Sequence, residues 1–150
     1  NGCHAAEVEI DPETGSVDLI RYIMVDDYGS LVNPTLTEGQ LHGGVAQGIG
    51  QALMEFVSFE DNTGQLLSGS LMDYTLPRAT MLPNFEATLE GSPTDANILG
   101  VKGVGQAGCI AAPQTIVHAV LNALSPLKIM HLDMPLTSQR IWRAISSSRA

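Results

Sequence analysis

Alternating apolar and polar residues predict a β-hairpin at the start of the chain. In residues 6–10, three apolar side chains alternate with two glutamates, as expected of a strand with one buried face. Residues 11–15, DPETG, have turn chemistry, because proline presets φ and glycine accepts a left-handed backbone. A returning strand is predicted over 17–25, so residues 4–25 form a hairpin.

Helical spacing of apolar side chains begins near residue 35. Thr35 and Glu38 have the spacing of a capping box, and apolar residues then recur every three or four positions as far as Phe56. Five glycines interrupt this predicted helix, and each costs about 1 kcal/mol relative to alanine. Either close packing or a bulky molecule lying against the helix explains them. They are Gly39, Gly43, Gly44, Gly48 and Gly50.

The middle of the chain predicts further strands. Apolar residues on both sides of a polar turn predict a second hairpin over 57–71. Shorter strands are predicted over 85–89 and 129–133.

Two more helices complete the pattern. One is predicted to begin near Pro113, because proline is tolerated in a first helical turn, and to end at Ser125. Thr137 is the predicted cap of the last helix. These elements indicate an α+β fold, in which antiparallel β-hairpins pack with about three helices. The whole chain, 1–150, is predicted to be one domain with no internal boundary.

Composition and charge exclude some partners. Sixteen acidic residues against seven Lys and Arg give a net charge of −9, so no nucleic-acid partner is expected. No membrane span is expected, because no run approaches roughly 18 apolar residues. Cys3 and Cys109 demand no disulfide, which favours a cytoplasmic location. Because the chain starts at Asn1, close to a predicted strand, it is expected to be a piece of a longer polypeptide.

Glycines concentrate in residues 100–113, GVKGVGQAGCIAAP, just before an apolar helical pattern. Glycine permits positive φ and a close approach of the backbone to a ligand. A helix start exposes N–H groups to anions and polarised oxygens. This stretch therefore predicts a ligand-binding turn.

Residues 103–108 also match the G-x-G-x-x-G outline of a dinucleotide-binding turn. The preceding strand would span only 98–101, a helix beginning near Pro113 starts too late, and no strand–helix–strand repeat is visible. A non-catalytic binding domain, for a nucleotide or a partner protein, is the alternative function. The pair Asp26 and Asp27 is interpreted either as a cation site or as a solvated turn.

Six segments spread over nearly the whole chain carry a further signal. They are HAAEVEIDPETG at 4–15, VDDYGSLVNP at 25–34, EGQLHGGVAQGIGQAL at 38–53, GSLMDYTLPRA at 69–79, GVKGVGQAGCIAAP at 100–113 and HLDMPLT at 131–137. Together they resemble the large, molybdenum-binding subunit of the molybdenum hydroxylases: xanthine dehydrogenases, aldehyde oxidases and aerobic carbon monoxide dehydrogenases. The resemblance implies the C-terminal part of a larger molybdopterin-binding domain, whose other walls come from upstream sequence.

The resemblance assigns roles to single residues. Gln40 matches the family glutamine that contacts the cofactor near the metal, and a carboxamide can both donate and accept hydrogen bonds. Hydrogen bonding at the helix N-terminus is the alternative role for Gln40. Lys102, Gly103, Val104 and Gly105 match the turn whose backbone lies against the pterin and the metal centre. No residue is expected to ligate the metal directly.

Position 106 departs from the family pattern. Where the family has glutamate, in KGVGEAG, which resembles a catalytic general base, this chain has Gln106. An amide keeps the shape and the hydrogen bonds, but it does not take up a proton at working pH. The branch uses another base, has lost its activity, or carries a changed residue; the three explanations stay open.

The resemblance also implies an activity and partners. It implies an oxidoreductase that hydroxylates an aldehyde, an N-heterocycle or a similar small substrate, with water as the oxygen source. The implied cofactor is molybdenum–molybdopterin, with or without a cytosine dinucleotide, with FAD and iron–sulfur clusters on partner subunits or domains. The expected partners are the upstream part of the same subunit, an FAD subunit and an iron–sulfur subunit, in an oligomer. The chain alone is expected to be inactive.

Overall fold

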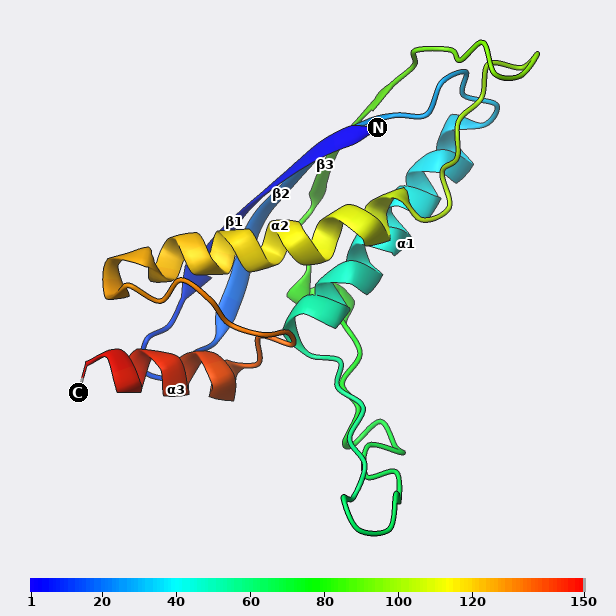
Figure 1. Ribbon diagram of the computed structural model, residues 1–150. Coiled ribbons are helices and arrows are strands. Elements are labelled where there is room, and N and C mark those ends of the chain that lie inside the picture. Colours follow the sequence, from blue (N-terminus) through cyan, green and yellow to red (C-terminus); the bar gives the residue numbers. More distant parts are fainter. Residues whose placement is uncertain (150) are drawn as a thin grey trace.

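The first two strands form the predicted hairpin. In the computed structural model, which describes residues 1–149, β1 spans Gly2–Ile10 and β2 spans Val17–Asp27. The strands pair antiparallel along the full length of β1. Gly15 in the turn has a φ of +73°, as the turn chemistry predicts. Figure 1 shows the pair as a long twisted ribbon.

The third strand makes the sheet mixed. β3, Phe85–Glu90, pairs in parallel with the second half of β2, and the strand order is β1-β2-β3. The predicted strand over 85–89 is therefore confirmed, as is the α+β fold with three helices, and the parallel pairing of β3 makes the sheet mixed. Between β2 and β3 the chain passes through a helix and a long loop, and such a crossover brings the next strand back in the same direction.

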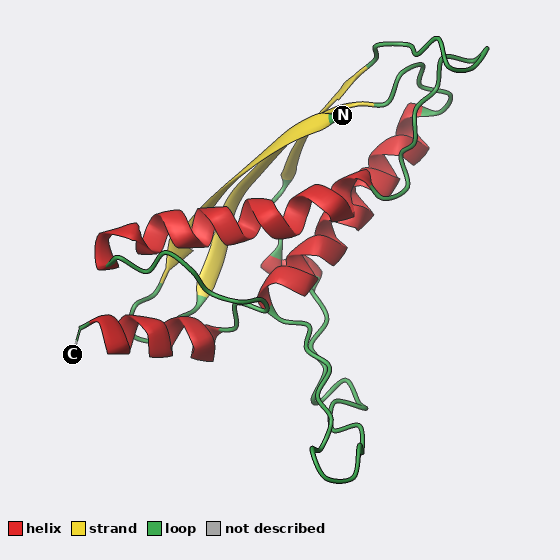
Figure 2. Ribbon diagram, in the orientation of Figure 1, coloured by secondary structure: helices red, strands yellow, loops and turns green. Residues whose placement is uncertain are grey.

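The predicted hairpin over 57–71 forms only around its turn. Phe59 forms an antiparallel bridge with Leu66, and the N–H groups of Glu60 and Leu67 donate to the carbonyls of Gln65 and Ser58, both at 2.8 Å. The segment belongs to the loop 54–78, which projects away from the body of the molecule (Figures 1 and 2). The side chain of Phe59 is 57% exposed, and residues 68–71 form no strand, so the hairpin does not reach its predicted length.

Helix α1, Pro34–Leu53, begins slightly earlier than predicted. Its cap is Asn33, whose side-chain Oδ1 accepts the N–H of Leu36 at 3.1 Å, and Pro34 lies in the first turn. Asparagine is a strong helix cap and proline is favoured directly after it, so this pair prevails over the predicted capping box at Thr35.

Helix α2, Ala107–Leu124, begins well before Pro113, which lies inside the helix. The predicted helix start at Pro113 was therefore wrong. Pro113 is buried against α1, where Gly48 lies opposite it, and this packing offsets the backbone hydrogen bond that proline removes. Gly108 consequently lies in the first turn of α2.

The last helix and the segment before it tie the C-terminal part to the body. Thr137 caps α3, Ser138–Ser148, as predicted, and its Oγ1 accepts the N–H of Arg140. Residues 129–133 form no strand, contrary to the prediction, but an extended connection from α2 to α3. The backbone N–H of Leu136 donates to the carbonyl of Ala52 at 2.6 Å, which anchors this connection to the end of α1.

The core lies between the sheet and the two long helices. α2 contacts β1 and α1, and α1 contacts β3 (Figure 1). Fully buried side chains from all these layers meet there; the largest are Tyr22, Met24, Leu41, Ile49, Ile116, Leu136, Ile141 and Ile145.

One segment of the chain has the length and hydropathy of a membrane span. Residues Ala107–Leu127 have a mean hydropathy of 1.3 over their most apolar stretch, so the expectation that no segment reaches this level was wrong. Ile116 and Val120 of this segment are fully buried. α2 packs against α1 and β1, and a core helix of a folded domain has the same composition.

Candidate cofactor-binding site

The glycine turn is attached to the chain that follows β2. Val101 forms a bridge with Gly29, and the N–H of Lys102 donates to the carbonyl of Tyr28 at 3.0 Å. Gly100 has a φ of +64°, and a side chain at that position would collide with Pro93. The turn therefore has one defined path from the sheet to the start of α2.

An ion pair holds the turn in place. The ammonium group of Lys102 binds the carboxylate of Asp27, which also accepts the backbone N–H groups of Gly29 (2.9 Å) and Ser92 (3.0 Å). The hydrogen bond from Lys102 and these two backbone donors hold the pKa of Asp27 well below its usual range. Asp27 is thus neither a cation site nor part of a solvated turn. The sequence alone does not indicate that Asp27 pairs with Lys102. Their contact depends on how the end of β2 and the glycine turn meet in the fold.

Gln40 and the turn line one hollow, the Gln40 hollow. It has a volume of about 280 Å³ and lies between the segment after β2, the first turns of α1 and the glycine turn. Gln40, Lys102 and Val104 all line it. Asn33 caps the helix, so the alternative role of Gln40 at the helix N-terminus is already filled. The side chain of Gln40 is exposed at the edge of this hollow.

The rest of the turn lines a second hollow, the Gln106 hollow, of about 610 Å³. Gly103, Gly105 and Gln106 line it, and Val104 borders both hollows. Gln106 is the N-cap residue of α2, but its side chain makes no cap hydrogen bond. The turn therefore separates two adjoining hollows and presents the amide of Gln106 at one of them.

Close packing explains one group of glycines. A Cβ on Gly48 would lie 2.7 Å from the Cβ of Ala112, and one on Gly108 would lie 2.6 Å from the carbonyl oxygen of Leu41. Gly44 is similarly close to the backbone of α2. These glycines allow α1 and α2 to approach each other.

A second group of glycines faces open space. A Cβ on Gly39 or Gly43 of α1, or on Gly103 or Gly105 of the turn, would meet no atom within 4 Å. Backbone without side chains on two neighbouring elements leaves room for a broad ligand to lie flat against both. Close packing therefore explains the glycines of α1 that face α2, whereas the face that carries Gly39 and Gly43 is open.

The exposed face of α1 also carries amides. Gln40, Gln47 and Gln51 are all exposed and follow helical spacing on the side of Gly43. The sequence reasoning missed Gln47 and Gln51, although their spacing from Gln40 in the sequence would have revealed a common face.

A buried hydrogen-bonded chain runs beneath the Gln106 hollow. The hydroxyl of Tyr22 lies 2.8 Å from Nδ1 of His4, and Nε2 of His4 lies 2.9 Å from Oδ2 of Asp26. Burial raises the pKa of Tyr22 to about 12. Asp26 lines the hollow itself, so both interpretations of Asp26 and Asp27 were wrong for Asp26 as well. Strand alternation contained this signal, because Tyr22, Met24 and Asp26 share one face of β2.

Tyr28 contributes an unpaired polar atom. It is 2% exposed, and its hydroxyl has no hydrogen-bond partner among the described residues. Burial raises the pKa of Tyr28 above its ordinary value, and the charge of Asp26 adds to this. Tyr28 lines the Gln40 hollow. A buried hydroxyl without a partner in a site lining indicates that a ligand group completes its hydrogen bonding.

The donor set fits a bulky organic ligand. Within residues 1–149 no cluster of three or more His, Cys, Asp and Glu side chains is placed to hold a metal ion. The two hollows offer backbone, amides and glycine surface instead. A pterin that brings its own metal and is held by hydrogen bonds and flat contact fits these groups.

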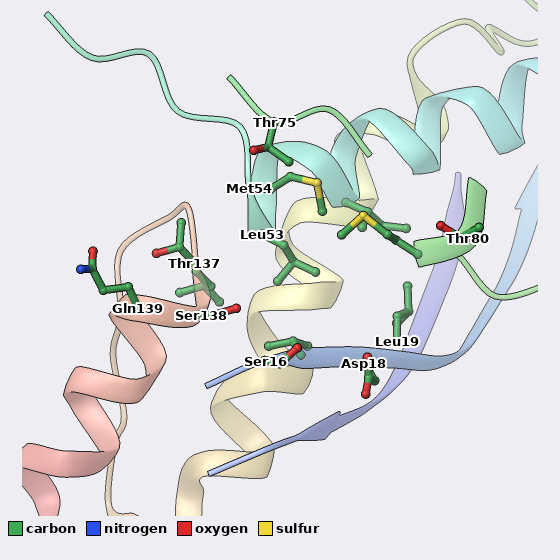
Figure 3. Close-up of a pocket in the computed structure, with 14 residues that line it drawn as sticks. Ser16, Asp18, Leu19, Leu53, Met54, Thr75, Thr80, Thr137, Ser138 and Gln139 are labelled. Atoms are coloured by element: carbon green, nitrogen blue, oxygen red, sulfur yellow. The ribbon is translucent and has the colours of Figure 1, made fainter. Parts of the chain in front are cut away.

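A third hollow, of about 510 Å³, lies at the other end of β2 and α1 (Figure 3). It is lined by the start of β2, the end of α1 and the start of α3, with Thr75, Thr80 and Ser138 among its polar groups. None of the predicted site residues lies there.

Comparison with known proteins identifies the family. A family model described as a molybdopterin cofactor-binding domain matches residues 1–83. The nicotine 6-hydroxylase large subunit of Paenarthrobacter nicotinovorans is 42% identical over 144 residues, which are 96% of this chain and 18% of that protein. The carbon monoxide dehydrogenase large chain of Hydrogenophaga pseudoflava is 36% identical and covers the same shares.

A solved structure agrees as well. The crystal structure of quinoline 2-oxidoreductase from Pseudomonas putida 86 superposes with a TM-score of 0.93 at 40% identity, over 97% of this chain and 18% of that one. The chain thus spans 18% of the length of these relatives. Sequence, fold and site agree that this chain belongs to the molybdopterin cofactor-binding domain family, as a portion of the large subunit of a molybdenum hydroxylase.

Proposed function

We propose that this chain is the C-terminal cofactor-binding portion of an oxidoreductase that hydroxylates a small substrate, with water as the oxygen source. An aldehyde or an N-heterocycle is the proposed substrate class. One observation carries the proposal: Gln40 and the glycine turn line adjoining hollows, and a Cβ on Gly43 of α1 or on Gly103 or Gly105 of the turn would meet no atom within 4 Å. The names of the relatives, a nicotine hydroxylase and a carbon monoxide dehydrogenase, support this reaction class.

Each element has a separate task in this proposal. The carboxamide of Gln40 donates and accepts hydrogen bonds at the edge of the pterin. The backbone of Gly103, Val104 and Gly105 lies against its face. Lys102 acts through Asp27, because their ion pair holds the backbone of the turn in position against the pterin. The bound cofactor supplies two-electron redox chemistry at molybdenum.

Gln106 occupies the position of the base in this arrangement. Its amide orients a water or substrate group by hydrogen bonds, but it does not accept a proton. The proton must therefore go to another group of the assembled enzyme, or turnover is slow.

The partners follow from the same proposal. The upstream part of the subunit closes the site, and separate FAD and iron–sulfur subunits or domains accept the electrons in an oligomeric complex. The proposed cofactor is molybdopterin, either alone or with a cytosine dinucleotide attached. Cys3 and Cys109 are both free, which supports a cytoplasmic location. This chain alone, with part of the site and no electron acceptor, is inactive.

The decisive measurement is the molybdenum and pterin content of the full-length subunit, purified with its partner subunits. We expect both in near-stoichiometric amounts. Gln40→Leu lowers the pterin content, whereas Gln114→Leu, at an exposed position of α2 outside both hollows, leaves it unchanged. Absence of molybdenum and pterin from an intact complex would overturn the proposal.

A nucleotide-binding role is the second candidate. Helix α2 begins at Ala107, so Gly108 lies in the first helical turn, as a dinucleotide fingerprint requires. The strand before the turn is lacking in the described residues, where Val101 forms only an isolated bridge. Titration of the cofactor-free subunit with NAD, FAD and ATP separates the two roles: micromolar binding that Gly105→Val abolishes favours the nucleotide.

A further inference from the structure

Asp26 is the one ionisable side chain among the residues that line the Gln106 hollow. The others are small, apolar or amide residues. Asp26 is only 4% exposed, and a carboxylate is rarely so buried unless it is paired. A buried carboxylate at the wall of an apolar hollow is well placed to interact strongly with whatever occupies it.

His4 positions this carboxylate. The side chain of His4 is 1% exposed, and its Nε2–H donates to Oδ2 of Asp26 at 2.9 Å. The hydroxyl of Tyr22 donates to Nδ1 on the other side of the ring at 2.8 Å. We assign these directions because an ionised carboxylate only accepts. Oδ2 of Asp26 is thus held by His4, and His4 is held in turn by Tyr22.

Gly2 makes room for the other oxygen. A Cβ on Gly2 would lie 1.8 Å from Oδ1 of Asp26, and Gly2 also lines the Gln106 hollow. Oδ1 therefore occupies the space that any other residue at position 2 would fill. His4 binds the opposite oxygen, so Oδ1 is the one left for an occupant of the hollow.

We propose that Asp26, positioned by His4, is the proton acceptor of the Gln106 hollow. This rests on the proposed function and deepens it, because it names a group that replaces the carboxylate that Gln106 lacks. The O–H bond of a water or hydroxyl group in the hollow breaks, its electron pair stays on that oxygen, and the proton bonds to Oδ1 of Asp26. His4 is a positioning residue, which keeps its own hydrogen bond to Oδ2 throughout.

The charges around Asp26 are few. His4 faces it from β1, and Tyr22 and Tyr28 lie on its own strand and just beyond. The nearby cation, Lys102, is paired with Asp27. A change in turnover in an Asp26 variant therefore reports on Asp26 and its histidine.

The test uses the full-length subunit assembled with its partners, in five variants. Asp26→Asn removes the acceptor, and Asp18→Asn, at an exposed position of the same strand, is the matched control. Asp26→Asn combined with Gln106→Glu supplies a carboxylate from the other wall. His4→Leu removes the donor, and His4→Gln retains an N–H at the place of Nε2. Molybdenum and pterin content is measured for every sample.

We expect Asp26→Asn to lower turnover by about 10²–10⁴-fold, and Gln106→Glu to restore turnover in the double variant. His4→Leu is expected to lower turnover as well, because Asp26 loses the donor that orients it, and His4→Gln, which retains an N–H, is expected to restore turnover. Infrared difference spectra with labelled aspartate, recorded with an unreactive substrate analogue, show a protonated carboxyl band that Asp26→Asn abolishes and Asp18→Asn retains.

Wild-type turnover in Asp26→Asn overturns this inference. So does a loss of turnover that Gln106→Glu does not restore, with the infrared band unchanged. In both cases normal molybdenum and pterin content leaves the proposed function intact, whereas a wild-type complex without cofactor overturns the function itself.

Discussion

Gln106 begins α2 with a side chain free of any cap hydrogen bond, so glutamate can replace it without loss of a contact within the helix. A carboxylate at a helix N-terminus is also favoured by the helix dipole. Gln106→Glu is therefore expected to fold normally and to raise turnover of the assembled enzyme on an aldehyde or N-heterocycle. The gain is at most about 10²–10⁴-fold, the usual worth of a general base, and smaller to the extent that Asp26 already accepts the proton.

Steady-state turnover of matched samples with equal molybdenum content checks this prediction. Gln114→Glu adds the same charge at an exposed position of α2 outside the hollow and serves as the control. Equal turnover of Gln106→Glu and wild type would mean that position 106 does not take part in proton transfer.

Asp27 gives a prediction with a defined pH dependence. Its folded pKa lies below the ordinary value of 3.8, so its ion pair and hydrogen bonds stabilise the turn above that pH and are lost as the pH falls below it. Asp27→Asn is therefore expected to increase hydrogen exchange in residues 100–106 at neutral pH. The difference from wild type shrinks as the medium is acidified through the carboxyl range.

Mass spectrometry of the full-length subunit measures this exchange, with each variant compared to wild type at the same pH. Glu9→Gln, an exposed carboxylate on β1, is the control. Equal protection of the turn in Asp27→Asn and wild type at neutral pH would show that the ion pair with Lys102 does not hold it.

At the scale of the element, glycines serve two different purposes: some allow α1 and α2 to pack closely, and others leave a face of α1 open. A methyl group on Gly108 of α2 would press on the backbone of α1 at 2.6 Å, whereas one on Gly43 would point into open space. Gly108→Ala is expected to destabilise the subunit by about 1–3 kcal/mol through overpacking. Gly43→Ala is expected to stabilise the helix by about 1 kcal/mol and yet to lower the pterin content, because its methyl group takes the place of the ligand.

Thermal unfolding of the cofactor-free subunit and pterin analysis of the loaded one distinguish these effects. Stability and cofactor content fall together in Gly108→Ala and change in opposite directions in Gly43→Ala. Unchanged pterin content in Gly43→Ala would show that the open face of α1 does not meet the cofactor.

Elements whose neighbours are close in sequence were predictable. The first hairpin and the cap of α3 at Thr137 follow from local turn and capping chemistry. The start of α2 was not, because Pro113 reads as a helix start until packing against Gly48 is known. The hairpin over 57–71 was only partly predictable for a related reason. Apolar residues beside a turn indicate that one face of a hairpin is buried, but they do not indicate which element buries it.

The candidate site divides in the same way. Gln40 and the glycine turn stand out in the sequence through their motifs, and the fold brings them to adjoining hollows. The pair Asp27 and Lys102 stayed hidden, since it joins positions far apart along the chain. Asp26 and His4 were within reach, since strand periodicity places both on the inner face of the hairpin.

At the scale of the whole molecule, the glycine turn, which borders both hollows, and the loop 54–78 lie at different ends of the body (Figure 1). The loop carries large apolar side chains with almost no cover: Leu71 is 77% and Met72 is 92% exposed, and Phe56, Val57, Phe59 and Leu67 are more than half exposed. Such a concentration is unusual on the surface of a monomer and marks a surface that meets other protein.

This chain by itself is therefore expected to self-associate through the exposed apolar side chains of this loop. Light scattering of the purified 150-residue chain over a concentration series should show a mass that rises above 15.9 kDa. Replacing Phe59, Leu71 and Met72 by serine, glutamine and glutamine should lower the mass at each concentration. Met130→Gln, at an exposed methionine outside the loop, should leave it unchanged. A monomer at every concentration would mean that the loop folds back and covers its own apolar side chains once it is separated from the rest of the subunit.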